Sequence, residues 1–436
     1  MASTECMLPM FNLWQPNAMQ NQVEKWFVQE YTPISAIGDK QPIVFVANGV
    51  PNQCWLLHKS YISVSCKLVK PDDTNIAAGV DVSLCNNVIH SIFSQIEVEL
   101  NDKQVSDNNS LYPVKAYFEN VLCYSKEAQD TWMLLEGFIK DTAGKMDVFT
   151  RDAGSDNKGV LARGVIFDGS KEVELMGRPH CDLFTQDRAI IPNCKLGMRF
   201  IPARDNYVVK TVAPDRPENQ VAYKLKITSM RLHLYVLQIS DSLSIAFEKM
   251  LQTGNARYPV TKVSMKTLTI PANQTTMLHD NLYLGKLPKR LVLALATDAS
   301  MAGGYQQNPF NFDHFGLNYL VLNVNGDMVP ARPYTPDYAT KKYLSVYNGM
   351  FTGMRCQFSD HPVPITYGEF AKGYCFYVFD LTAHGHSGCQ SNIQSGTIRI
   401  ESKFAAATAA TLNLICYAEF DDIIEIDKFR NTIALY

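Results

Sequence analysis

The chain has 436 residues, of which 46% are hydrophobic, 11% are aromatic and 19% are charged. This length exceeds what one ordinary core accommodates, so we expect two domains of roughly 200 residues each. The formal net charge is −3 and neither end carries a Lys- or Arg-rich arm, which argues against direct, specific binding of nucleic acid. The charged fraction is below the usual ~25%, as is typical of a surface covered by other copies, although a monomer with large cores gives the same figure.

The ends and the cysteines indicate an intracellular setting. The N-terminus has no basic start followed by an apolar run, so no signal peptide is predicted. No stretch approaches 18 consecutive apolar residues, so we expect no transmembrane segment. The 11 cysteines are odd in number and mostly lie within apolar runs. They therefore indicate reduced, buried thiols and not a disulfide framework.

In chain order, residues 1–40 are predicted to be an irregular N-terminal arm, which either clasps a neighbouring subunit or packs on its own domain. Alternating apolar and polar residues then predict a first all-strand domain over residues 41–240. The inward parity changes near Thr228 in its last strand, which indicates a bulge. The strands expected in this half cover residues 42–47, 61–68, 95–100, 160–167, 171–176, 195–201 and 223–239.

Two loops interrupt the first half. Residues 139–160 are polar and rich in turn formers, so we expect an exposed insertion. Asp168-Gly169, between two expected strands, predicts a hairpin.

The second half repeats the strand-rich pattern of the first half. Residues 241–256 are predicted to be a helical bridge, which leads into a second all-strand domain over residues 257–420 and a mixed C-terminal tail over residues 421–436. The expected strands of this half cover residues 260–270, 281–284, 287–296, 317–324, 374–381, 397–404 and 411–420.

One pattern of strand, turn, strand and helix occurs twice. The first copy turns at Asn101-Asp102 and opens its helix at Pro113. The second turns at Asn325-Gly326, and its helix is expected from Pro336, capped by Thr335, to Asn348-Gly349. The two asparagines are 325 − 101 = 224 residues apart, close to half of the 436 residues, which indicates a duplication.

About eight short strands in each half, joined by one helical connection, are typical of a jelly roll. We therefore predict an all-β fold of two tandem jelly-roll β-sandwich domains, with short helices inserted in the connections.

No group of residues is expected to be catalytic, to bind a cofactor or to bind a metal. The segment Gly164 to Lys171 has the glycine spacing of a phosphate loop, but its Gly-Lys-Ser order is scrambled and it lies in an expected hairpin. His384, His386 and Cys389 could bind zinc together with His361, but no second pair at zinc-finger spacing exists and a plain loop is favoured.

Three further features have an ordinary structural interpretation. Asp421 and Asp422 should point to opposite faces of a strand, so they do not form an acid–base pair across a substrate. Arg231 and His233 share a strand face, for which solvation is the default interpretation. Aromatic residues in loops are typical of protein interfaces, or else cover the end of their own sandwich. They are Phe310, Phe312, Phe315, Tyr334 and Tyr338.

Longer motifs carry a resemblance to a known family. They are Gly285-Lys-Leu-Pro-Lys-Arg-Leu-Val292, Asn308-Pro-Phe-Asn-Phe-Asp-His-Phe315, Leu317-Asn-Tyr-Leu320, Val324-Asn-Gly326, Ala116-Tyr-Phe-Glu-Asn120, Tyr124-Ser-Lys126, Leu134-Leu-Glu-Gly137, Phe167-Asp-Gly-Ser-Lys171, His180-Cys-Asp-Leu-Phe184 and Gly254-Asn-Ala-Arg-Tyr-Pro259. With these motifs the chain resembles the major capsid (hexon-like) proteins of adintoviruses and Maverick/Polinton elements.

The resemblance implies a double jelly roll in one polypeptide and a closed homotrimer whose six similar units tile an icosahedral shell around a DNA genome. It implies no enzymatic activity. The implied partners are other copies of the chain and a penton-like protein with a single jelly roll, in a virion capsid assembled in the nucleus or cytoplasm of a host cell. The loops 139–160 and 297–311 are expected to face outward.

Two alternatives stay open. One is a jelly-roll carbohydrate-binding or glycan-active protein, which would need exposed aromatic residues and paired carboxylates on a concave sheet face. The other is a domesticated relative that forms trimers but no shells.

Overall fold

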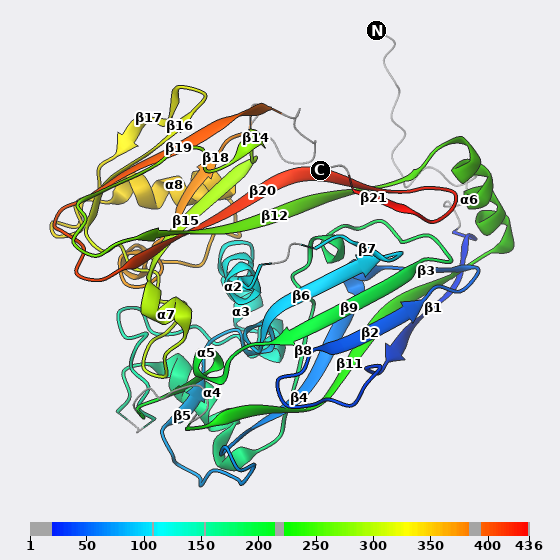
Figure 1. The fold of residues 1–436 in the computed structure, drawn as a ribbon, viewed down its shortest axis with the longest axis horizontal. Coiled ribbons are helices and arrows are strands. Elements are labelled where there is room, and N and C mark those ends of the chain that lie inside the picture. The colour runs from blue at the N-terminus through cyan, green and yellow to red at the C-terminus, as the bar shows by residue number, and fades with distance from the viewer. Residues whose placement is uncertain (1–19, 107–108, 152–153, 214–221, 383–393, 435–436) are drawn as a thin grey trace, which may run out of the picture.

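The computed structural model describes residues 20–106, 109–151, 154–213, 222–382 and 394–434. These residues form two β-sandwiches, one from each half of the chain, with helices at the junction between them (Figure 1).

In the first sandwich one sheet has the strand order β1-β11-β4-β8 and the other has the order β2-β9-β6-β7. The strands are β1 (Val23–Tyr31), β2 (Ile43–Asn48), β4 (Tyr61–Val69), β6 (Phe93–Leu100), β7 (Lys103–Gln104), β8 (Val173–Gly177), β9 (Lys195–Pro202) and β11 (Lys224–Ile239). Among the shorter strands, β3 (Gln53–Trp55) pairs with β11, and β5 (Val82–Leu84) and β10 (Val209–Thr211) form a separate two-stranded sheet.

The second sandwich repeats this arrangement, with the orders β12-β20-β15-β18 and β13-β19-β16-β17. Its strands are β12 (Ala256–Ile270), β13 (Thr276–His279), β15 (Arg290–Thr297), β16 (Leu317–Val324), β17 (Asp327–Tyr334), β18 (Tyr377–Asp380), β19 (Ser395–Phe404) and β20 (Leu412–Ile426), with β14 (Leu284–Lys286) and β21 (Thr432–Ala434) at edges. In both sandwiches the main strands, ranked along the chain, pair as 1-8-3-6 and 2-7-4-5. This is the jelly-roll order, and the predicted duplication and fold class are confirmed.

Short helices fill the connections. They are α1 (Val88–Ser91), α2 (Tyr112–Leu122), α3 (Lys126–Gln129), α4 (Lys158–Ile166), α5 (Asp205–Val208), α6 (Asp241–Thr253), α7 (Asp298–Ala302), α8 (Leu344–Met354) and α9 (Tyr367–Phe370), with a 3₁₀ turn η3 (Trp132–Glu136). Both α2 and α8 have 11 residues, and each follows the same hairpin of its sandwich. No helix among the described residues has the length and apolar character needed to cross a bilayer.

The repeated hairpin turns are confirmed in detail. Asn325 and Gly326 have φ values of 52° and 98°, and Asn101 and Asp102 have values of 51° and 63°. Positive φ at both central residues is what a two-residue turn between right-twisted strands requires.

The predicted start of the second helix is wrong. The chain stays non-helical after Pro336, because the backbone of Asp337 pairs with that of Lys342 in both directions, at 3.0 and 2.7 Å. Helix α8 begins only at Leu344 and runs past Gly349 to Met354.

Three expectations for the first half are also wrong. Residues 160–167 form most of helix α4 and not a strand, because Asn157 caps this helix by accepting a hydrogen bond from the N–H of Val160. Asp168-Gly169 therefore follows a helix and does not join two strands. The described residues of the segment 139–160, which are 139–151 and 154–160, are not an exposed insertion, since Asp141, Met146 and Phe149 are buried.

Other local predictions are confirmed. The β4–β11 register shifts between Ile227 and Ser229, where a bulge was expected. Helix α6 begins after Ser240 and ends before Gly254. Two other expectations are wrong: the N-terminal segment predicted to be irregular contains the paired strand β1, and β20 continues beyond residue 420 to Ile426. The division of the chain into five segments otherwise stays a prediction.

The cores follow strand alternation. On β4, the side chains of Ile62, Val64, Cys66 and Leu68 are all buried, and each such apolar burial contributes about 1.5–3 kcal/mol. The cysteines within the described ranges are free thiols, mostly buried. Buried apolar residues of both sandwiches form one continuous cluster, so the two cores are joined at the junction.

Candidate functional surfaces

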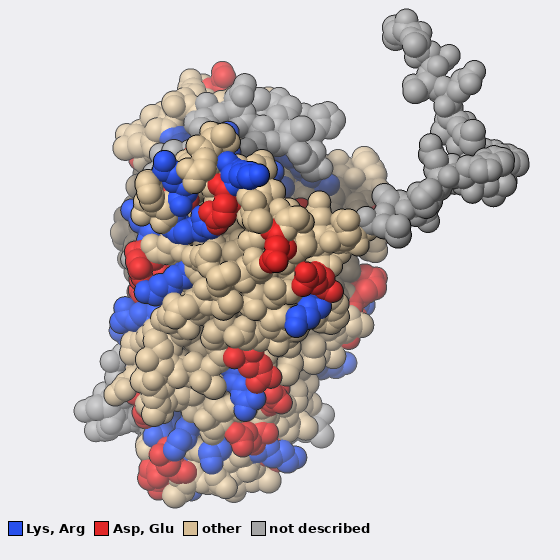
Figure 2. Space-filling view, turned by 90° about the vertical axis from the view of Figure 1, so that its right-hand side faces the viewer, with Lys and Arg blue, Asp and Glu red and all other residues tan. Residues whose placement is uncertain are grey.

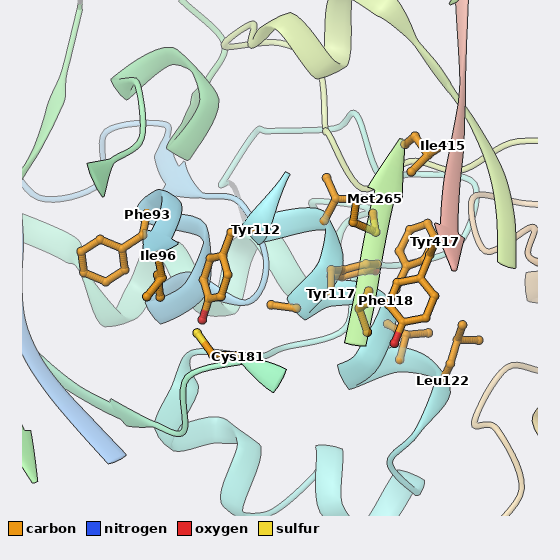
Figure 3. Packing of buried hydrophobic residues seen from close by; sticks show 14 of the residues in the cluster. Phe93, Ile96, Tyr112, Tyr117, Phe118, Leu122, Cys181, Met265, Ile415 and Tyr417 are labelled. Carbon is orange, nitrogen blue, oxygen red and sulfur yellow. The ribbon is translucent and has the colours of Figure 1, made fainter. Parts of the chain in front are cut away.

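Aromatic side chains join the two sandwiches. Tyr117 and Phe118 lie on α2, which belongs to the first sandwich. The ring of Tyr117 stacks on Phe310 with centroids 4.2 Å apart, and the ring of Phe118 meets Phe312 edge-on at 5.2 Å. Figure 3 shows Phe118 against Tyr417 of β20, at 5.9 Å. Helix α2 is therefore a shared core element of both sandwiches.

The contacts at this junction show what the aromatic residues of the loop from Asn308 to Phe315 do. Phe310 and Phe312 are fully buried. They lie inside the chain, because Phe310 stacks on Tyr117 of α2 and Phe312 contacts both Phe118 of α2 and Phe376 of its own half. Residues 297–311, expected to face outward, carry helix α7 and the buried Tyr305, so this segment packs within the chain.

A buried ion pair and its hydrogen bonds also connect the two sandwiches. The guanidinium of Arg163 donates to Asp141 at 2.6 Å, and the two side chains are 1% and 0% exposed. The other oxygen of Asp141 accepts from the amide of Asn308 at 3.2 Å, and the hydroxyl of Tyr374 donates to the carbonyl of Asp141 at 2.8 Å. The segment predicted to be an exposed insertion thus links the sandwiches, which fixes their relative position.

The segment with the glycine spacing of a phosphate loop has a structural role. In the segment from Gly164 to Lys171, Asp168 pairs with Arg151 at 2.9 Å and accepts from the N–H of Gly79. A side chain at Gly164 would collide with that of Arg151, which explains the glycine by packing.

The two carboxylates on β20 also have separate roles. Asp421 pairs with Lys289 at 2.8 Å, and Asp422 is buried with its carboxylate against the N–H of Ile423. They do not oppose each other across a cleft, as predicted from strand geometry.

Arg231 and His233 do not form a basic site. Arg231 pairs with Glu30 at 3.0 Å. His233 is buried, contacts the hydroxyl of Ser63 at 2.9 Å and stacks on Tyr61 at 4.6 Å. Of the possible zinc ligands, His384, His386 and Cys389 lie outside the described residues, and His361 is exposed.

Sequence reasoning missed a buried cluster of His90, Glu136 and His180. One possible ligand atom from each residue lies within 4.8 Å of the other two. Burial lowers the pKa of His90, so its imidazole is neutral near pH 7. The residues come from α1, η3 and the segment after β8, and no spacing motif connects them.

Apolar side chains also lie exposed on one side of the molecule. Trp26 of the edge strand β1 is 62% exposed and stacks on Tyr235 at 5.0 Å. Helix α6 has 13 residues, all described, and Leu251 is the one among them that is buried, whereas Ile245 and Met250 are exposed. Figure 2 shows this side, where charged residues are scattered around a broad uncharged area.

The chain is similar in sequence to a curated protein. No family model matches the chain. A curated protein of Caenorhabditis elegans, described as uncharacterized, is 24% identical over 357 residues, which cover 80% of this chain and 81% of that protein.

Solved structures match over almost the whole length. A chain of the Sputnik virophage cryo-EM structure has a TM-score of 0.67 at 13% identity, covering 100% of this chain and 93% of that chain. The mavirus major capsid protein has a TM-score of 0.55 at 10% identity, covering 100% and 96%. The Faustovirus major capsid protein has a TM-score of 0.55 at 9% identity, covering 94% and 92%. The chain therefore has the double jelly-roll fold found in viral major capsid proteins.

Proposed function

We propose that this chain is a viral major capsid protein, of the kind found in adintoviruses and Maverick/Polinton elements, that assembles as a homotrimer into an icosahedral shell around a DNA genome. The observation that carries the proposal is the pairing order, repeated strand by strand, of two jelly rolls in one chain. Three such chains around one axis present six similar units, which is a pseudo-hexagonal tile for a closed shell.

The junction supports this function, because a tile must keep its shape. The stacked rings of Tyr117 and Phe310 and the buried pair of Arg163 and Asp141 join the halves through both apolar and polar contacts. The function is structural, and the chain acts without catalysis.

We place one trimer contact on helix α6 and the edge strand β1. A helix of this length is marginal in water unless its apolar face is covered. Exposed Ile245, Met250 and Trp26 provide apolar surface for another copy to cover. The other partners would be neighbouring trimers and a penton-like protein with a single jelly roll. We place the protein in the virion capsid, assembled in the nucleus or cytoplasm of a host cell.

The mass of the purified protein in solution tests the proposal. Light scattering should give three times 49.0 kDa, and negative-stain images of the same fractions should show pseudo-hexagonal particles or closed shells. A stable monomer at micromolar concentration would contradict the trimer. Trimers that never close into shells under any assembly condition would instead support a domesticated protein.

The glycan-active alternative has less support. It needs two carboxylates facing one substrate, whereas Asp421 is paired with Lys289 and Asp422 is buried. Binding of the purified protein to a glycan array would reopen it.

A further inference from the structure

The cluster of His90, Glu136 and His180 lies inside the first sandwich. All three side chains are buried, with exposed fractions of 0%, 3% and 6%. Buried polar groups normally have hydrogen-bond partners, yet Nε2 of His90 has none of good geometry among the described residues. The nearest carboxylate oxygen, on Glu136, lies 3.5 Å from it.

From this geometry we propose that His90, Glu136 and His180 bind a divalent first-row transition metal ion, with Zn²⁺ as the best match. Two imidazoles and one carboxylate are a donor set that zinc uses in proteins. Because donors bound to one tetrahedral zinc at about 2.0–2.1 Å lie roughly 3.3 Å from one another, the 3.5 Å between His90 and Glu136 already fits. The largest separation, at most 4.8 Å, closes with a small movement of a side chain.

Contacts at Nδ1 orient the imidazole rings of His90 and His180 for metal binding. Nδ1 of His90 lies 2.9 Å from the hydroxyl of Tyr112, and Nδ1 of His180 lies 2.5 Å from a carboxylate oxygen of Glu119. A metal-bound histidine almost always makes such a contact through its other ring nitrogen, which sets the tautomer. Nε2 is then the ligand atom of each ring.

The carboxylate is held in the same way. The amide of Asn120, itself buried, donates to Oε2 of Glu136 at 3.1 Å. This contact fixes the orientation of Glu136 from α2, while the carboxylate belongs to η3. The three ligands therefore come from three separate segments of the first sandwich, while the supporting residues Tyr112, Glu119 and Asn120 all lie on α2. A bound ion would join these segments.

His180, one of the three ligands, also borders a small cavity. Tyr112, Lys115 and Asp182 line the rest of this cavity, whose volume of about 30 Å³ is enough for a water molecule. A water molecule there can complete the coordination of an ion held by three side chains. The competing explanation is a metal-free cluster in which His90 and His180 share protons with Glu119 and Glu136.

Zinc content distinguishes these explanations and does not depend on capsid assembly. The full-length chain, with any affinity tag removed, is stripped with EDTA, exposed to ZnCl₂, desalted and measured by mass spectrometry of metals. We expect one zinc ion per chain in the native protein and loss of that ion in Glu136→Gln and in His180→Gln. Glu136→Gln is the sharper variant, because glutamine keeps the shape and can still accept from Asn120. The control variant H384Q/H386Q, which removes the other histidine pair, should keep the ion.

Two further measurements use the native protein, so they stand even if a variant misfolds. Cobalt in place of zinc should give visible d–d absorption bands, and saturating zinc should raise the Tm by roughly 3 °C, reversibly with EDTA. The proposal is overturned if the native chain binds no zinc, if Glu136→Gln binds as much as the native chain, or if H384Q/H386Q loses the ion.

Discussion

The ring of Tyr117 lies flat against the ring of Phe310, with centroids 4.2 Å apart and planes inclined by 3°. One residue belongs to a helix of the first jelly roll, and the other precedes strand β16 of the second. This contact joins the two halves, whose buried apolar residues form one continuous cluster.

Truncating this stack should destabilise the whole chain. We expect Phe310→Ala to lower the free energy of unfolding by about 3–5 kcal/mol, because it opens a cavity at a fully buried site. Urea unfolding followed by tryptophan fluorescence measures this change. In a double-mutant cycle with Tyr117→Leu, the coupling energy should be about 0.5–1.5 kcal/mol. Phe358→Ala is the matched control, since Phe358 is 97% exposed, and a large loss of stability in the control would contradict the burial argument.

The buried ion pair predicts that loss of a buried arginine costs more stability than loss of an exposed arginine. Arg163→Met should cost about 3–5 kcal/mol, because Asp141 would stay buried without its guanidinium partner. Arg257→Met is the control: Arg257 pairs with Glu425 at 2.9 Å but is 68% exposed, so its loss should cost about 1 kcal/mol or less. Equal urea midpoints for the two variants would show that Asp141 does not depend on Arg163.

Charges placed on α6 should prevent trimer formation without unfolding the chain. In the double variant I245D/M250D, two exposed apolar side chains become carboxylates, which a dry interface would not accommodate. We expect light scattering to give one third of the native mass, with an unchanged circular dichroism spectrum. Ser242→Asp serves as control, because an acidic residue is tolerated in the first turn of a helix. A double variant that remains trimeric would remove α6 from the interface but leave the trimer itself intact.

His314 predicts a loss of stability in weak acid. Its Nδ1 accepts a hydrogen bond from the N–H of Gly316 at 2.9 Å, and its ring stacks on Tyr338 at 3.9 Å. Burial lowers the pKa of His314 below its ordinary value of 6.5, although Asp313 acts in the opposite direction. The unfolded chain therefore binds this proton more tightly, so stability falls as the pH drops through 6.5 and levels off below the folded pKa.

Asparagine at this position tests the effect, because its side-chain oxygen can still accept from Gly316 but does not titrate. The urea midpoint of His314→Asn should fall less than that of the native chain between about pH 7.5 and about pH 5.5. The exposed His361→Asn should behave as the native chain does. An identical drop in all three proteins would rule out His314 as a source of acid sensitivity.

Local patterns in the sequence predicted the strands well, because burial in a sheet has a period of two. Strand β9 shows this, since Leu196, Met198 and Phe200 are buried as their alternation indicated. The hairpin turns at Asn101 and Asn325 were equally readable, since few residues tolerate positive φ.

Local patterns failed where another nearby contact competed with the predicted element, or where the partners lie far apart in the chain. Val160 begins a run that suits a strand, yet Asn157 caps a helix there. Pro336 can start a helix, yet pairing between Asp337 and Lys342 delays it to Leu344. The His90 cluster combines positions 90, 136 and 180, which share no motif, so only the folded chain reveals it.

The sequence by itself determined the two-fold repeat, the strand faces and the turns, because these depend on residues close together in the chain. Only the tertiary structure decided that Phe310 and Phe312 lie at a junction inside the chain and that Asp141, Met146 and Phe149 are buried in a segment expected to be exposed. Composition marks such segments as apolar or polar, but burial is set by partners far away, as Phe310 and Tyr117 show across 310 − 117 = 193 positions.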